Sequence, residues 1–428
     1  MRPILNLVWF VAVLPVCNSQ TLPARLSALP AAAHRSILQS LSQDMPWSQL
    51  AELTASDGGP DDELGWSVAV SGNTVVVGAP FANVGSNQSQ GAAYVFVKPK
   101  NGWENMTQVA KLTASDGQPD DRFGWSVAVS GDTVTVGNFN LGDEVGDYVF
   151  VKPPDGWKNN TETAKLACGP YVAISGDTAV CASFRSQAYV YVKPKNGWKS
   201  TFDYDALLVT TDGDKNFFSS ISIDGDVLVI GAADSNNESD VAYLYVKPKG
   251  GWTITSNPTH LAAQTAKLTA SDSNSGDYFG LSVSVSGDSV AVGAPDAIVN
   301  PPNKGGAAYV FVKPASGWVN MNETAKLTAA ATDDNSSLGT SVAIRGGTLV
   351  AGNPTGSIAN NLEGQAYVFV EPAGGWATTS TFNAVLTPSD DQRFDQFGGA
   401  VAINSRAIVV GDTHFELLHP GAAFVFGH

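Results

Sequence analysis

The phrase VFVKPKNGW at residues 95–103 recurs along the chain, and this recurrence is the feature that most limits the fold. Variants of the phrase occur at 149–157, 190–198, 244–252, 310–318 and 368–376. Each belongs to a unit that opens with a variant of AKLTASD, and seven such openings lie 42 to 60 residues apart. Repeats of this length are typical of solenoids and propellers, so we expect a chain built from seven similar units.

Each unit contains four short runs with the composition of β-strands. In the second unit they are WSVAV (125–129), TVTVG (133–137), GDYVFV (146–151) and TETAKLA (161–167). The first three runs are rich in Val, Tyr and Phe, and all four are bounded by turn-forming residues. In six units a Gly-Asp, Gly-Asn or Gly-Gly pair separates the first two runs, which suits a two-residue hairpin with positive φ. The sequence therefore predicts an all-β fold.

The two ends of the repeat region predict a closed ring. The last unit stops after its third run, AAFVF at 422–426. The first unit is preceded by PWSQLAELTAS at 46–56, which resembles the Trp and fourth run of the other units. We therefore expect Trp47 and a strand at about 48–54 to complete the last unit, which leaves no open edge between the ends. This favours a seven-bladed β-propeller of four-stranded antiparallel blades over a capped solenoid.

The first residues indicate export. Residues 1–19 have one basic residue, an apolar run and small polar residues, which is the pattern of a secretory signal peptide. Residues 20–45 are interpreted as a flexible or weakly helical lead-in, with a removable pro-segment as the alternative. The propeller is expected to occupy 46–428, where no segment is long and apolar enough to span a bilayer. We therefore expect a secreted protein with no membrane span in the mature chain.

The net charge indicates which partners to expect, and the cysteines and sequons indicate which covalent modifications to expect. The formal net charge of −16 should repel nucleic acid, so no nucleic-acid partner is expected. Cys168 and Cys181 lie in the shortest unit, and export permits a disulfide between them; two buried thiols are the alternative. Six N-x-[ST] sequons lie in predicted loops and would be glycosylated in a eukaryotic source, at Asn87, Asn105, Asn159, Asn237, Asn322 and Asn335.

Three segments resemble a known repeat. LGWSVAVSGNTVVVGAP (64–80), FGWSVAVSGDTVTVG (123–137) and FGLSVSVSGDSVAVGAP (279–295) are similar to FG-GAP repeats, which build the seven-bladed head of integrin α-chains and occur in bacterial and algal exported proteins. The resemblance covers about residues 46–428 and is closer to the bacterial type. It implies an extracellular binding or adhesion module. Integrin-type repeats hold Ca²⁺ in a D-x-D-x-D-G loop, but the turn SGDT fills that place here, so that site is not implied.

A different acidic pattern recurs before the Gly of FG or LG. Asp stands eight and three residues before this Gly in four units, at Asp57 and Asp62, Asp116 and Asp121, Asp272 and Asp277, and Asp390 and Asp395. Such loops could supply several of the six to eight oxygens that Ca²⁺ prefers. We favour the alternative that the Asp side chains form Asx-turns. Ca²⁺ is thus the one cofactor that the sequence suggests.

Two tryptophans are candidates for ligand binding. The Trp of each KPxxGW phrase has a fixed place and is expected to pack between blades, although it could instead stack on sugars. The Lys of VKP is expected to protect strand edges from aggregation, with a ring that binds acidic polymers as the alternative. Trp66 and Trp125 differ because only two units have Trp after LG or FG. This irregularity favours a role in ligand binding.

Catalysis has little support. Asp412, His414 and Glu416 lie in a 410–420 loop unique to the seventh unit and could form a metal or acid–base set. G-x-S-x-G and H-E-x-x-H motifs are absent from the sequence. We expect a non-enzymatic exported protein that binds a cell-surface or matrix protein or glycan through propeller loops. The alternatives are a polysaccharide lyase or hydrolase with the 410–420 loop in its site, and a purely structural wall or matrix component.

Overall fold

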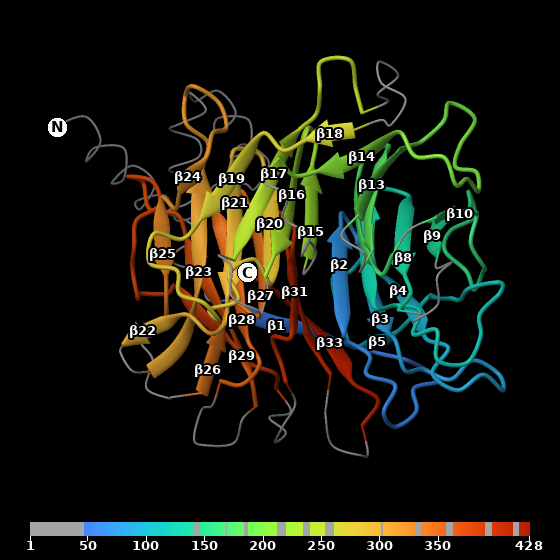
Figure 1. The fold of residues 1–428 in the computed structure, drawn as a ribbon. Helices are drawn as coiled ribbons and strands as arrows, with labels where there is room; N and C mark the ends of the chain where they lie inside the picture. The colour runs from blue at the N-terminus through green and yellow to red at the C-terminus, as the bar shows by residue number, and fades with distance from the viewer. Residues whose placement is uncertain are drawn as a thin grey trace, which may run out of the picture. The chain divides into compact units, whose positions relative to one another are not determined.

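A computed structural model shows the repeat region as a ring of seven β-sheets (Figure 1). The residues that the structure describes are 47–139, 146–167, 169–183, 187–211, 220–233, 240–252, 261–300, 303–329, 335–356, 363–389, 396–413 and 419–428. These residues form strands, turns and loops and contain no helix. The predicted signal peptide and lead-in lie outside them.

Each blade has four antiparallel strands, as the sequence predicts, and their bounds follow blade by blade. Blade 1 consists of β2 (Ser67–Ser71), β3 (Thr74–Ala79), β4 (Ala92–Val97) and β6 (Ala110–Leu112). Blade 2 consists of β7 (Ser126–Ser130), β8 (Thr133–Gly137), β9 (Gly146–Val151) and β10 (Ala164–Ala167). Blade 3 consists of β11 (Tyr171–Ser175), β12 (Thr178–Ser183), β13 (Gln187–Val192) and β14 (Ala206–Val209). Blade 4 consists of β15 (Ser220–Asp224), β16 (Val227–Ala232), β17 (Val241–Val246) and β19 (Ala266–Thr269).

The remaining blades follow the same order. Blade 5 consists of β20 (Ser282–Ser286), β21 (Ser289–Ala294), β23 (Asn303–Val312) and β25 (Ala325–Leu327), with β22 (Ile298–Asn300) and β26 (Asn335–Leu338) also paired to β23. Blade 6 consists of β27 (Ser341–Arg345), β28 (Thr348–Asn353), β29 (Gln365–Val370) and β30 (Ala384–Leu386). Blade 7 consists of β31 (Ala400–Ile403), β32 (Ile408–Asp412), β33 (Ala422–Gly427) and β1 (Ser48–Thr54). The first strands of neighbouring blades contact one another all round the ring, so they line its centre.

The predicted ring closure is confirmed. β1 pairs antiparallel with β33, so the first strand of the repeat region completes the last blade (Figure 1, blue beside red). Ala51 and Leu53 of β1 are buried against blades 7 and 1. Neighbouring blades are also joined at the rim, where β5 (Met106–Thr107), β18 (Leu261–Ala263) and β24 (Met321–Asn322) pair in parallel with the outer strands of the preceding blades, β1, β14 and β19.

One tryptophan packs between each pair of neighbouring blades, which confirms the structural interpretation of the repeated Trp. Six come from the KPxxGW phrases, namely Trp103, Trp157, Trp198, Trp252, Trp318 and Trp376. The seventh position, between blades 6 and 7, is filled by Trp47. The last unit therefore needs no Trp of its own, because Trp47, just before β1, occupies that position.

The glycines of the FG and VG motifs meet at the contact between blades. Gly124 N donates to the Gly137 carbonyl of its own blade (3.0 Å), while the Gly124 carbonyl accepts from Ser67 Oγ of blade 1 (2.8 Å). The Gly124 carbonyl also occupies the space that a Cβ would take on Gly78. Both positions therefore require glycine, and the same contact recurs between other blades, as at Gly293 and Gly339.

Asp147 is a buried carboxylate on β9 that the other blades lack. The matching position is Ala in all six other units, at Ala93, Ala188, Ala242, Ala308, Ala366 and Ala423. The Asp147 side chain is fully buried, and within the described part of the chain neither carboxylate oxygen has a hydrogen-bond partner. Burial raises the pKa of Asp147 well above its ordinary value, and only a weaker contribution from the Tyr148 amide opposes the shift.

We expect Asp147→Ala to stabilise the protein at pH 7 by about 1–3 kcal/mol, because it removes an unsatisfied buried group. The pKa is raised on folding, so the contribution of Asp147 to stability falls as pH rises above about 4, the ordinary Asp value. The gain from Asp147→Ala should therefore be larger at pH 7.5 than at pH 4.5 in urea unfolding. Asp203→Ala, at an exposed Asp, is the control, and a loss of stability in Asp147→Ala would show that the carboxylate is satisfied.

Candidate functional site

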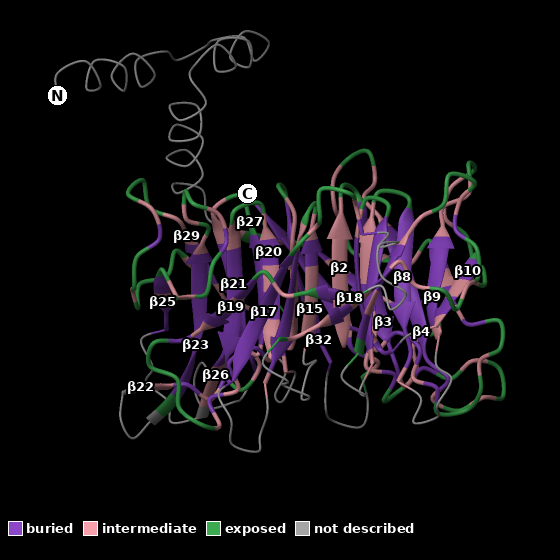
Figure 2. Cartoon of the chain, turned by 45° about the horizontal axis from the view of Figure 1, so that its top comes forward, coloured by how far each residue is buried: buried purple, intermediate pink, exposed green. Residues whose placement is uncertain are grey.

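The loops of the propeller lie on two faces, which carry different motifs. One, here called the FG face, holds the loops before the first strands and the loops between second and third strands. The other, the hairpin face, holds the SGDT-type turns and the KPxxGW loops. Exposed residues gather in these loops, while most strands are buried and some first strands, such as β2, are half-buried (Figure 2). The six described Asp of the acidic pattern, and both Trp66 and Trp125, belong to segments of the FG face.

The Asp three residues before the Gly caps its own loop in the units described. Asp62 accepts the Gly59 amide (2.8 Å), and Asp121 and Asp277 accept the equivalent amides of their loops. All three side chains are buried. Burial raises the pKa of Asp62, and the Gly59 amide opposes this. Each Asp thus accepts an amide three residues upstream, whereas an Asx-turn uses an amide downstream, so these contacts hold the loop but are not the Asx-turns that the sequence suggested.

The Asp eight residues before the Gly is held by a lysine of the outer strand. The Asp57–Lys111, Asp116–Lys165 and Asp272–Lys326 pairs each have an N–O distance of 2.6 Å. Each lysine also lies over a tyrosine ring of the third strand, with centroid distances of 5.3 to 5.5 Å. Burial is the largest single influence and raises the pKa of Asp116, but the hydrogen bond and charge of Lys165 together with the Tyr148 hydroxyl and the Asp116 amide outweigh it, so the Asp116 pKa is lowered. These carboxylates therefore tie each loop to its blade.

No assembled metal centre is visible in the described ranges. Among those residues no three His, Cys, Asp or Glu side chains are grouped as a metal ion would need. Asp390 and Asp395 lie outside the described residues. The Ca²⁺ assignment therefore stays a prediction.

The structure brings Trp66 and Trp125 together. Their ring centroids are 4.5 Å apart, and Trp125 lies 4.3 Å from Phe139. Trp66 also makes an edge contact with Phe81, at 5.9 Å. All four side chains are only half-buried. Together they form a continuous aromatic cluster across blades 1 and 2 of the FG face, here called the aromatic cluster.

Arg122 joins the two ends of the aromatic cluster. Its guanidinium carbon lies 5.3 Å from the Phe81 ring and 5.4 Å from the Phe139 ring. Arg122 has a positive φ of 52°, as do the matching residues Glu63, Tyr278 and Gln396, at 53° to 56°. The backbone conformation thus recurs in four units, and each of these units displays a different side chain from it.

A hollow of about 340 Å³ adjoins the aromatic cluster, here called the Glu63 hollow. It is formed by two loops of blade 1 and is lined by Asp61, Glu63, Phe81, Asn83, Gln88 and Ser89 among others. The Oε2 atom of Glu63 is buried and has no hydrogen-bond partner among the described residues. Burial, and then the Asp61 carboxylate, raise the pKa of Glu63 to about 7, while Arg122 opposes the shift.

Sequence reasoning missed four members of this site: Phe81, Phe139, Arg122 and Glu63. A signal was present, because Phe81 and Phe139 stand three and two residues after the VG motif of the second strand, in the two units that have Trp after the Gly. The sequence did not show that these residues converge, since the contacts join loops of two blades.

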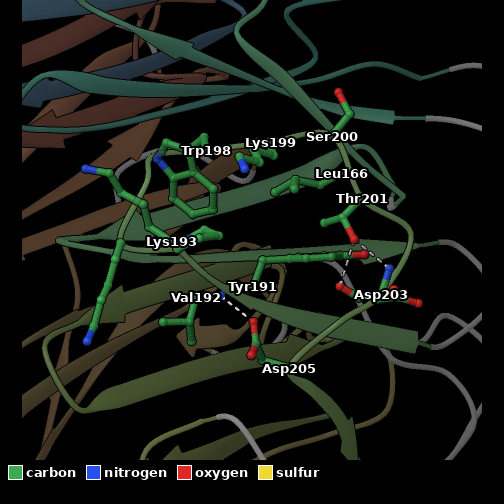
Figure 3. A pocket seen from close by; sticks show the side chains of 12 residues that line it. Leu166, Tyr191, Val192, Lys193, Trp198, Lys199, Ser200, Thr201, Asp203 and Asp205 are labelled. Atoms are coloured by element: carbon green, nitrogen blue, oxygen red, sulfur yellow. Dashed lines mark hydrogen bonds between the residues drawn. The ribbon is translucent and has the colours of Figure 1, made fainter.

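A second hollow, of about 630 Å³, lies on blade 3 beside Trp198 (Figure 3). Lys193, Lys195 and Lys199 surround it, together with Asp203 and Asp205. Asp205 is engaged by the Val192 amide (2.7 Å), and Lys193 pairs with Asp177, so both serve the blade itself. The hollow therefore shows mixed charge and few groups aimed at a ligand.

The VKP lysines pair with the acidic residue of the neighbouring hairpin. Lys152–Asp132, Lys193–Asp177, Lys247–Asp226 and Lys313–Asp288 have N–O distances of 2.6 to 3.5 Å. They lie on the hairpin face and link the end of the third strand to the turn between the first and second strands. Such exposed pairs are each worth little in stability.

Three other sequence predictions are tested only in part by the described residues. Cys181 is disulfide-bonded, but Cys168 lies outside the described residues, so that pairing stays a prediction. Asp412 is buried in β32, whereas His414 and Glu416 lie outside the described residues. The described residues also contain no helix suited in length and apolarity to crossing a membrane.

Four of the six sequons have described side chains. Asn105 and Asn159 use Oδ1 to accept the backbone amides of Glu52 and Lys111, and Asn322 Oδ1 accepts the Thr269 hydroxyl. Asn87 instead donates through Nδ2, the atom to which a glycan would be attached, to Gln90 and Gly117. The side chains of Asn237 and Asn335 lie outside the described part.

Comparison with known proteins matches the repeats directly. The sequence model described as FG-GAP repeat matches residues 47–96, 106–150, 262–311, 321–369 and 381–426. No curated protein matches the chain. Among solved structures, the computationally designed Ika8 protein superposes with a TM-score of 0.48 at 12% sequence identity, covering 89% of this chain and 99% of that one.

Proposed function

The chain belongs to the FG-GAP repeat family, and we propose that it is an exported, non-enzymatic protein that binds an extracellular protein or glycan through its FG face. A propeller of this family is a scaffold for binding, and its specificity lies in the side chains that its loops present. Export rests on the signal-peptide pattern of residues 1–19.

The aromatic cluster is the observation that carries the proposal. Half-exposed aromatic side chains gathered on one face are typical of binding surfaces, where Trp and Arg supply much of the affinity. The fold does not need these tryptophans, because Leu281, Thr340 and Gly399 occupy the matching position in blades 5, 6 and 7. A role outside the fold is therefore the better account of Trp66 and Trp125.

We expect the double substitution Trp66→Leu and Trp125→Leu to weaken ligand binding at least tenfold while the protein remains folded. Leu is the residue that blade 5 carries at this position, so it is compatible with the backbone. The loss of two indoles in contact removes the side chains that should carry most of the contact energy. Arrays of glycans and matrix proteins, followed by affinity measurement on the ligands that bind, give the readout.

Phe202→Ala is the matched control, because Phe202 is a large aromatic residue that is 83% exposed on blade 3. Equal binding by wild type and the double variant would refute the role of the aromatic cluster. A parallel array with a Ca²⁺ chelator tests whether the Asp loops contribute to binding, since loss of binding on chelation would assign a metal ion to them. Release of products from a bound glycan would overturn the non-enzymatic part of the proposal.

A further inference from the structure

The Glu63 hollow contains a hydrogen-bond acceptor that the protein leaves unused. Glu63 Oε2 is buried without a partner in the described part of the chain, and a buried polar atom in this state is costly. Arg122 does not satisfy it, since its guanidinium lies over the rings of Phe81 and Phe139 and the structure shows no Glu63–Arg122 ion pair among described residues. Oε2 has almost no accessible surface, so a ligand in the hollow would hydrogen-bond the Glu63 carboxylate at Oε1, the oxygen that is not among the buried unpaired atoms.

The other walls of the hollow offer groups of complementary kinds. Asn83 uses Oδ1 to accept the Ser89 amide (3.0 Å), which leaves its NH₂ group available as a donor. Gln88 is exposed at the rim and offers both a donor and an acceptor. The Phe81 ring supplies an apolar wall. Donors, acceptors and one aromatic face within a single small hollow match a ligand that has hydroxyl groups around a ring with apolar C–H faces.

The charges of the site exclude acidic ligands. Asp61 and Glu63 both line the hollow, and the whole chain carries a net charge of −16. A carboxylate or sulfate on the ligand would be repelled at close range. Arg122 is the nearby cation, and its guanidinium lies over the Phe81 and Phe139 rings, 5.3 and 5.4 Å from their centroids.

We infer that the ligand is an uncharged saccharide, one unit of which occupies the Glu63 hollow against Phe81 and donates hydroxyl hydrogen bonds to Glu63. The adjoining units lie along the aromatic cluster, which continues from Phe81 through Trp66 and Trp125 to Phe139. This inference rests on the proposed function and specifies the ligand class of the same face.

Two substitutions at position 63 test the inference, and both use residues that other blades carry there with the same backbone conformation. Glu63→Gln copies Gln396 and replaces the carboxylate by an amide, so binding should weaken about tenfold with the loss of charge-assisted hydrogen bonds. Glu63→Tyr copies Tyr278 and fills the hollow, so binding should weaken further. Glu104→Gln, at an exposed Glu after Trp103, is the control and should bind as wild type does.

The probes are a glycan array and, for titration calorimetry, cellohexaose, chitohexaose and mannohexaose as uncharged chains, with polygalacturonate as the acidic one. Binding of an uncharged chain that weakens in Glu63→Gln and Glu63→Tyr supports the inference. If binding is lost in the Trp66→Leu, Trp125→Leu variant but unchanged in both Glu63 variants, the proposed function is supported and the binding role of the Glu63 hollow is refuted. The inference also fails if only polygalacturonate or only proteins bind. Absence of any ligand that depends on the tryptophans refutes both.

Discussion

Gly124→Ala is expected to destabilise the protein by at least about 3 kcal/mol, whereas Gly131→Ala should cost only about 1 kcal/mol. Both glycines have positive φ, at 95° and 58° respectively. A Cβ on Gly124 would collide with the Ala92 carbonyl oxygen of blade 1 and lie 3.1 Å from the Ala79 amide nitrogen. A Cβ on Gly131, at the hairpin between β7 and β8, would meet nothing within 4 Å.

The two substitutions, Gly124→Ala and Gly131→Ala, distinguish the cost of backbone strain from the cost of disturbed packing between blades. Urea unfolding followed by circular dichroism gives both free energies of unfolding under one set of conditions. Equal costs at the two positions would mean that strain at positive φ is the whole effect. The close approach of Gly124 to blade 1 would then contribute nothing measurable.

Leu53→Asp is the second substitution from which we expect a large effect, a loss of roughly 4 kcal/mol or more. Leu53 is fully buried on β1, in the core shared by blades 7 and 1. A carboxylate there has no partner, and it weakens the strand that closes the ring. Because β1 pairs with β33 at the other end of the chain, its release would expose an open edge on blade 7.

Leu50→Asp is the matched control, because Leu50 lies three residues earlier on the same strand and is 39% exposed. We expect it to change the free energy of unfolding little. Limited proteolysis of the two variants adds a local readout, since Leu53→Asp should make residues 47–54 susceptible to cleavage. Similar stability of the two variants would contradict the view that β1 is an integral part of the ring.

Much of the fold could be predicted because its determinants are local and repeated. The strand runs, the hairpins with positive φ at Gly131 and its counterparts, and the place of the Trp in each phrase all recur seven or six times. The absence of a seventh phrase and the extra Trp47 together predicted the closure between β1 and β33. Repetition turned weak local signals into a reliable one.

The partners of the acidic residues could not be predicted in the same way. Asp57 and Lys111 are 54 residues apart, and only the pairing of β4 with β6 brings Lys111 beside the loop before blade 1. The sequence showed the spacing of the Asp residues but not the lysine that holds each of them. The contact of Asp62 spans only three residues, but its direction was not predicted, because the carboxylate accepts an upstream amide and not the downstream amide of an Asx-turn.

The sequence by itself determined that this chain forms seven similar blades and that the two ends of the repeat region meet. It also determined which two units carry an unusual Trp. These properties depend on short-range patterns and on counting repeats. Only the tertiary structure decided that Trp66 and Trp125 are in contact, that Arg122 lies beside two phenylalanine rings, and that Glu63 lines a hollow with its Oε2 atom unpaired among the described residues. The reason is geometric, because loops of neighbouring blades converge on one face only after the strands between them have packed around the ring.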